Sequence, residues 1–181
     1  MNCWKTINIQ KQYGMQRLFI ISSLTMLITF LFLYVPFTAY FSQNRLNDNY
    51  FSLFLLCMVI TYPIHKLLHY LPMIPLGKKV KKTIHIHYHF FPVIYFRAQE
   101  PIKKWNFLLA SITPVIVLNT VFIVCCFLFT HYVHYFLILF AYHFGMCVPD
   151  FIRMKNLWKA PNQCFVEENE NGFEILINKA S

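Results

Sequence analysis

The sequence predicts an all-α polytopic membrane protein with about four transmembrane helices, a cytoplasmic loop that resembles a β-hairpin, and a C-terminal β-hairpin. First, 57% of the 181 residues are hydrophobic and only 13% are charged, so a soluble domain of this size would leave large apolar patches facing water. Second, the apolar residues form four runs of roughly 20 residues, the length needed to cross a bilayer core. Third, the segments that join these runs differ in their content of Lys and Arg, and such a difference indicates the side of the membrane on which each segment lies.

The four apolar runs predict helices at residues 18–41, 50–72, 105–129 and 132–152. Together they form a membrane domain, residues 18–152, which includes a cytoplasmic loop at residues 73–104. A cytoplasmic arm, residues 1–17, precedes this domain, and a cytoplasmic tail with a hairpin, residues 153–181, follows it. The first run is longer than the apolar core of a secretory signal and lacks a small-residue cleavage site, so we expect it to be retained.

The distribution of basic residues predicts the orientation in the membrane. The arm, the central loop and the tail are rich in Lys and Arg, whereas the two opposite connections contain only Arg45 with Asp48, and His131. The positive-inside rule therefore predicts a multi-pass plasma-membrane protein with both termini in the cytoplasm. The formal charge of +9 is then explained by the lipid bilayer as partner, and no nucleic acid is expected. The six cysteines contain no CxxC pair, which indicates free thiols in a reducing compartment.

Two segments outside the spans show the alternation of strands. Residues 83–90 alternate polar and apolar positions, and a second extended piece at residues 93–97 follows Pro92, which predicts a hairpin in the central loop. Near the end of the chain, residues 163–168 and 173–177 flank a segment that contains Asn171-Gly172, a dipeptide that favours tight turns. We expect a small cytoplasmic hairpin there.

The sharpest chemical signal is the pair His65 and His69 near the cytoplasmic end of the second predicted helix. Histidines at positions i and i+4 lie on one helix face, so both imidazoles can reach one metal ion. In zincins this pair belongs to the motif His-Glu-x-x-His, whose glutamate is the general base. Lys66 stands at the glutamate position, and an ammonium beside a divalent cation is a poor base. The alternative is an interfacial histidine pair with water or carbonyl partners.

Asp150 is the candidate third ligand, because it is the acidic residue that lies within the four predicted spans. The topology places it near the same leaflet as His65 and His69. His143 precedes Asp150 by seven residues, about two helical turns, and is expected as a ligand or as a supporting partner of one. The alternative for Asp150 is an ion pair with Arg153 or Lys66 at a helix end.

The central loop carries three histidines on one face of its first predicted strand, namely His85, His87 and His89. Such a face could bind metal, but a polar strand face is the preferred interpretation. Residues 83–97 could present an edge strand to a substrate or partner peptide.

With these residues identified, the chain resembles a bacterial family of membrane zincin peptidases, a domain family of unknown function related to the site-2 protease group. The resemblance runs from the second helix to the C-terminal hairpin. It implies a zinc ion, Zn²⁺, held by His65, His69 and Asp150, and a third helix in which Pro114 and Asn119 are the proline and the supporting polar residue. The acidic C-terminal hairpin is similar to the end of such proteins as well.

The sequence departs from the family pattern at two positions. Lys66 replaces the general base, and Pro149 replaces the glycine that precedes the aspartate. The resemblance therefore implies a metal-binding protein that is an inactive or atypical intramembrane metallopeptidase, with a membrane protein or peptide as client. Two alternatives remain open: a non-catalytic membrane binding or scaffold protein, and a small transporter component with His143 and Asp150 as a polar path.

Overall fold

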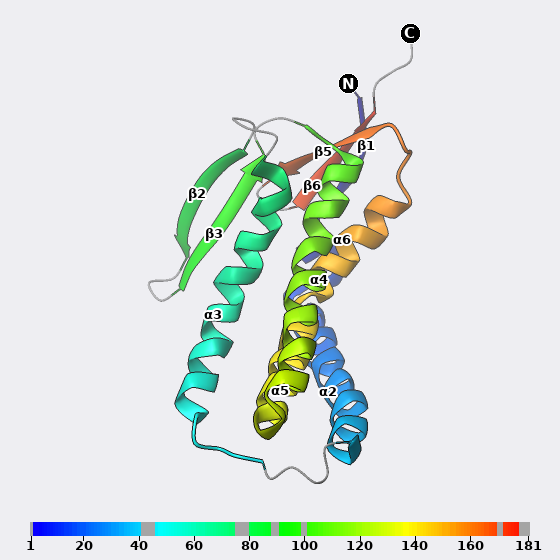
Figure 1. Cartoon of the computed structure of the whole chain (residues 1–181). Helices are drawn as coiled ribbons and strands as arrows, with labels where there is room; N and C mark the ends of the chain where they lie inside the picture. The colour runs from blue at the N-terminus through cyan, green and yellow to red at the C-terminus, as the bar shows by residue number, and fades with distance from the viewer. Residues whose placement is uncertain are drawn as a thin grey trace. The chain divides into compact units, whose positions relative to one another are not determined.

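A computed structural model describes residues 2–40, 46–74, 80–87, 91–98, 101–169 and 172–177. Figure 1 shows the helices and strands along the chain. The helices are α1 (Ile9–Tyr13), α2 (Met15–Tyr40), α3 (Phe51–Tyr70), α4 (Lys104–Leu128), α5 (Val133–Met146) and α6 (Val148–Trp158), with a 3₁₀ turn, η2 (Thr130–Tyr132), before α5. The strands are β1 (Asn2–Ile7), β2 (Val80–His87), β3 (Phe91–Ala98), β4 (Ile102–Lys103), β5 (Cys164–Asn169) and β6 (Gly172–Ile177).

The prediction of a mostly α-helical, polytopic fold is confirmed. Three helices are long and apolar enough to cross a membrane, namely α2, α4 and α3 with its short extension to Ile74. A bent pair, Thr130–Met146 and Val148–Trp158, makes a fourth candidate if it counts as one span.

The fourth apolar run differs from the single helix predicted at residues 132–152. The chain bends by 43° between Met146 and Val148, and α6 then continues to Trp158. Pro149 accounts for the break, because its nitrogen carries no hydrogen for the carbonyl of Gly145 and its ring crowds the preceding turn. As a result Asp150 lies in the first turn of α6, where the positive end of the helix dipole favours a carboxylate.

The chain divides into two compact units. The sheet unit comprises Met1–Met15, Lys66–Thr113 and Asp150–Ser181, and the helical unit comprises Gln16–His65 and Pro114–Pro149. The division passes through the continuous helices α3, α4 and α6, so each of these helices has residues in both units.

A four-stranded antiparallel sheet in the order β1-β6-β5-β4 forms the core of the sheet unit. The C-terminal hairpin predicted from the sequence is confirmed as β5 and β6, which pair from Cys164 opposite Ile177 to Asn169 opposite Gly172. Strand β1 was not predicted. A Cβ atom at Gly172 would collide with the carbonyl oxygen of Ile7, so glycine permits the close approach of β1 to the hairpin.

The central loop forms a second, two-stranded antiparallel sheet of β2 and β3. Their register pairs His85 with Val93 and His87 with Phe91, which confirms the predicted hairpin in this loop. His89 lies outside the described residues.

Lys104 secures the end of α6 in the sheet unit. Its ammonium is buried and donates hydrogen bonds to the carbonyl oxygens of Ala160, at 2.7 Å, and Trp158, at 3.4 Å. A cation at a helix C-terminus satisfies carbonyl groups that have no partner within the helix and interacts favourably with the dipole. This contact holds the helix that carries Asp150.

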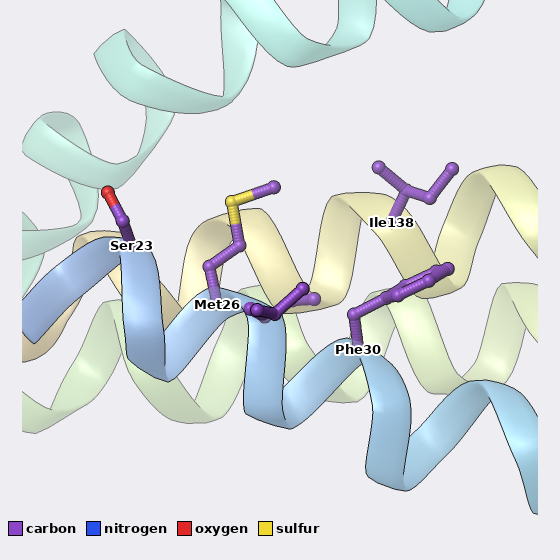
Figure 2. A pocket seen from close by; sticks show the side chains of 6 residues that line it. Ser23, Met26, Phe30 and Ile138 are labelled. Carbon is purple, nitrogen blue, oxygen red and sulfur yellow. The ribbon is translucent and has the colours of Figure 1, made fainter.

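In the helical unit, α2 packs against α5 through a glycine. A Cβ atom at Gly145 would lie 2.7 Å from the carbonyl oxygen of Ser22 and 2.9 Å from Cβ of Met26. Further along these helices, a pocket of about 400 Å³ is lined by Ser23, Met26, Leu27, Phe30, Ile138 and Ala141. Figure 2 shows that Ser23, Met26 and Phe30 come from α2 and Ile138 from α5. These residues offer no imidazole, thiol or carboxylate, so none of them is among the candidate metal ligands.

Candidate metal centre

Helix α3 positions the two histidines of the motif. His65 and His69 are one helical turn apart, and their donor atoms lie within 4.8 Å of each other. His65 is buried, together with Phe54 and Thr61 on the same helix. The spacing of these three residues, seven and then four positions, places them on one face. This buried face of α3 therefore ends at the histidine pair.

The hydrogen bonds of His69 determine which of its nitrogens can bind a metal. Nδ1 of His69 lies 2.8 Å from the carbonyl oxygen of Ala110, so Nδ1–H donates this bond and Nε2 of the neutral ring carries the lone pair. Nε2 in turn lies 3.4 Å from Oδ2 of Asp150. Two electron-rich atoms at this separation repel each other unless a proton or a cation lies between them. The donor set therefore fits a metal ion.

Asp150 lies among charged groups of the sheet unit. Its side chain is 5% exposed, and its Oδ1 lies 3.7 Å from Nη1 of Arg153. Lys66 interacts electrostatically with Asp150, Arg153 and Glu168. The carboxylate thus faces one imidazole and two cationic side chains. Lys66, which replaces the glutamate of the zincin motif, therefore interacts with the carboxylate of Asp150.

A second cluster surrounds His65 in the helical unit. Nδ1 of His143 lies 2.7 Å from Oδ1 of Asn119, and Nε2 of His143 lies 3.0 Å from Nδ1 of His65. The amide oxygen can only accept, so Nδ1 of His143 carries the hydrogen and Nε2 accepts from Nδ1–H of His65. Nε2 of His65 then carries the lone pair. In this hydrogen-bond arrangement both histidines of α3 have their lone pair on Nε2, and a buried acceptor orients each ring.

The sequence analysis missed Cys147. This residue follows α5, is fully buried, and has its Sγ 3.5 Å from Nε2 of His143. The donor atoms of His65, His143 and Cys147 lie within 4.8 Å of one another. The spacing of His143 and Cys147, four residues apart in a helical run, was a visible signal, but the sequence could not pair it with His65. The chain therefore contains groupings of His, Cys and Asp that could bind a metal ion.

The remaining candidates belong to the loop and to the cysteine set. His85 and His87 occupy alternate positions of β2. All six cysteines are free thiols, as predicted. Cys164 is buried in β5, and burial raises the pKa of its thiol, which keeps it protonated and unreactive.

The helix with His65 and His69, whose second histidine faces a buried carboxylate, has the histidine spacing of zincins, with Lys66 in place of the glutamate. The chain belongs to the family described as "Putative zincin peptidase", whose model matches residues 58–165. The matched segment includes His65, His69, Asn119, His143 and Asp150 and begins after α2. No curated protein and no solved structure matches the chain.

Proposed function

We propose that this chain is a multi-pass membrane protein that binds one divalent metal ion through His65, His69 and Asp150. We further propose that it binds a membrane client without hydrolysing it by the usual zincin route. One observation carries the proposal: a nitrogen of His65, a nitrogen of His69 and a carboxylate oxygen of Asp150 lie within 4.8 Å of one another, close enough to share one ion.

The apolar surface of the helices supports membrane insertion. No side chain of α2 is buried within the chain, and Phe19 and Phe32 are 73% and 77% exposed. Val59 on α3 and Leu128 on α4 are about equally exposed, at 70% and 69%. In water, such surface costs about 25 cal/mol for each Å², whereas a bilayer accommodates it.

The division into units supports the proposed topology, with both termini in the cytoplasm and the plasma membrane as location. The sheet unit contains residues 1–15 of the arm, the central loop and the tail, which are the three segments expected on the inner side. All Lys and Arg residues except Arg17 and Arg45 belong to this unit, in line with the positive-inside rule. The pairing of β1 with β6 joins the two ends of the chain in one sheet.

Two imidazoles and a carboxylate form a donor set used by catalytic zinc sites, which hold three protein ligands. The family to which the chain belongs supports zinc as the ion. A divalent ion at such a site supplies Lewis acidity toward a carbonyl group and toward water. Asp150 contributes a negative charge that is stabilised at the start of α6.

Lys66 is the reason for proposing that catalysis is absent or atypical. The zincin route needs a carboxylate one position after the first histidine, to take a proton from water. An ammonium has no lone pair with which to accept that proton. In this chain Lys66 interacts with Asp150 instead, which favours a charge-balancing role. The chain can therefore keep metal ligands while it lacks the base.

The hairpin of β2 and β3 is the proposed docking element for the client. An extended segment of a membrane protein can add a strand to the edge of a small sheet through main-chain hydrogen bonds. The two strands of this hairpin pair over eight residues each, which is long enough to guide such an addition.

Metal content of the detergent-purified protein tests the metal site. After reconstitution with zinc, the wild type should contain about one zinc ion per chain, and His65→Ala, His69→Ala and Asp150→Ala should each lose it. His134→Ala is the matched control, because His134 is a largely buried histidine of α5 outside both candidate groups, and it should keep the ion. A wild type that binds no zinc would rule out the proposal.

A second experiment tests the missing base. Lys66→Glu restores the motif and should produce hydrolysis of a membrane peptide substrate where the wild type shows none. The double variant Lys66→Glu with His69→Ala controls for contaminating peptidases. Equal hydrolysis by the wild type and Lys66→Glu would show that another group acts as base.

A further inference from the structure

We infer that the helical unit contains a second metal site, made by His65, His143 and Cys147, which binds a monovalent soft ion, Cu⁺. This inference is independent of catalysis. The site shares His65 with the proposed zinc site, but it takes Nδ1 of that ring, two other ligands and a different ion. It begins from the three donor atoms, which lie within 4.8 Å of one another.

The spacing of the donors suits a shared ion. Nε2 of His143 lies 3.0 Å from Nδ1 of His65 and 3.5 Å from Sγ of Cys147. Ligand atoms that sit about 2.0–2.3 Å from one metal ion are separated by roughly 3–4 Å. His143 is at the centre of the group and is held by Asn119 through its other nitrogen, at 2.7 Å. Such a partner fixes the orientation of a ligating imidazole.

Burial and charge select the kind of ion. His65 is 2% exposed, and His143 and Cys147 are 0% exposed. The ring of Phe122 lies 6.2 Å from that of His143, so the surroundings are partly apolar. Cu⁺ with one thiolate and two neutral imidazoles has no net charge, whereas a divalent ion would leave one buried positive charge, which is costly.

The ligand set also favours Cu⁺ by its softness. A thiolate selects soft ions such as Cu⁺. On binding, the S–H bond of Cys147 breaks and an S–Cu bond forms. The thiol proton leaves to solvent, and the proton on Nδ1 of His65 moves to Nε2. No oxidant or reductant is consumed, because Cu⁺ enters and stays as Cu⁺.

Anaerobic titration with Cu⁺ against a chromogenic Cu⁺ chelator tests the site. The wild type should bind one Cu⁺ per chain, and Cys147→Ser and His143→Phe should each weaken binding at least 100-fold. Cys126→Ser is the matched control, because Cys126 is a buried cysteine of the same unit, 1% exposed, outside the group. It should bind like the wild type. Unchanged affinity in Cys147→Ser would overturn the inference.

Two further measurements keep the test independent of folding defects and of the zinc proposal. X-ray absorption at the copper edge of the wild type should show one sulfur and two nitrogen ligands, and a shell without sulfur would overturn the site. Asp150→Ala should retain full Cu⁺ binding while it loses zinc. A wild type that binds Cu⁺ but no zinc would reject the zinc proposal alone. A wild type that binds zinc but no Cu⁺ would reject the copper site alone.

Discussion

The two histidines of α3 belong to clusters of opposite electrostatic character. His69 faces Asp150, which lies near Arg153 and Lys66, so its surroundings are dominated by full charges. His65 contacts His143, whose other nitrogen faces the neutral amide of Asn119. The comparison teaches that one helical motif can serve two kinds of site, because the neighbours of each imidazole decide which ion is stabilised.

Hydrogen bonding differs between the clusters in the same way. In the charged cluster, Nδ1–H of His69 donates to the carbonyl oxygen of Ala110, so in the neutral ring Nε2 and the carboxylate oxygen that it faces are both acceptors. In the neutral cluster, each donor meets an acceptor from His65 through His143 to Asn119. A proton or a metal ion between these two atoms stabilises the charged cluster, whereas the neutral cluster is held by hydrogen bonds alone.

The largest effect is expected for Asp150→Asn, which removes the charge but keeps the shape of the side chain. Zinc affinity should fall at least about 100-fold, or about 2.7 kcal/mol, because the variant leaves two cations beside the site. Competition with a chromogenic zinc chelator measures this change. Cu⁺ affinity should be unaffected, and a parallel loss of both metals would show that the clusters are not distinct.

A smaller effect is expected for Asn119→Leu in the neutral cluster. Nδ1–H of His143 loses its buried acceptor, which should lower the free energy of unfolding by about 1–3 kcal/mol. It should also weaken Cu⁺ binding roughly 10- to 100-fold, because Asn119 orients the imidazole of His143. Thermal unfolding in detergent and metal titration measure the two effects. Asn156→Leu is the control, because the amide of Asn156 donates to the carbonyl oxygen of Ile152 within its own helix α6, and it should leave metal affinity unchanged.

The smallest effect is expected for Lys66→Met, which removes a cation from the charged cluster. Zinc affinity should rise about tenfold, equivalent to about 1.4 kcal/mol, since one repulsive charge beside the ion is gone. Arg153→Gln is the comparison variant: its side chain is 37% exposed and 3.7 Å from Asp150, so solvent screening should make its effect smaller. A fall in zinc affinity in Lys66→Met would mean that the ammonium supports the site.

Several parts of the fold follow from local sequence. The apolar runs predicted the long helices because a span needs about 20 apolar residues, and the alternation around His85 and His87 predicted a strand. The break before Asp150 could have been anticipated from Pro149, whose effect is local. Strand β1 could not be predicted in this way, because its partner β6 lies at the other end of the chain.

The candidate site likewise has features that follow from local sequence and features that depend on distant parts of the chain. The sequence by itself determined the shared helix face of His65 and His69, the charge of Asp150 and the replacement of the base by Lys66, since these depend on residue identity and helical period. Only the tertiary structure decided which ring nitrogen each histidine offers, and that Cys147 joins His143 and His65. Tautomers and donor distances depend on acceptors supplied by other helices, Ala110 and Asn119 on α4, and no periodicity within α3 specifies them.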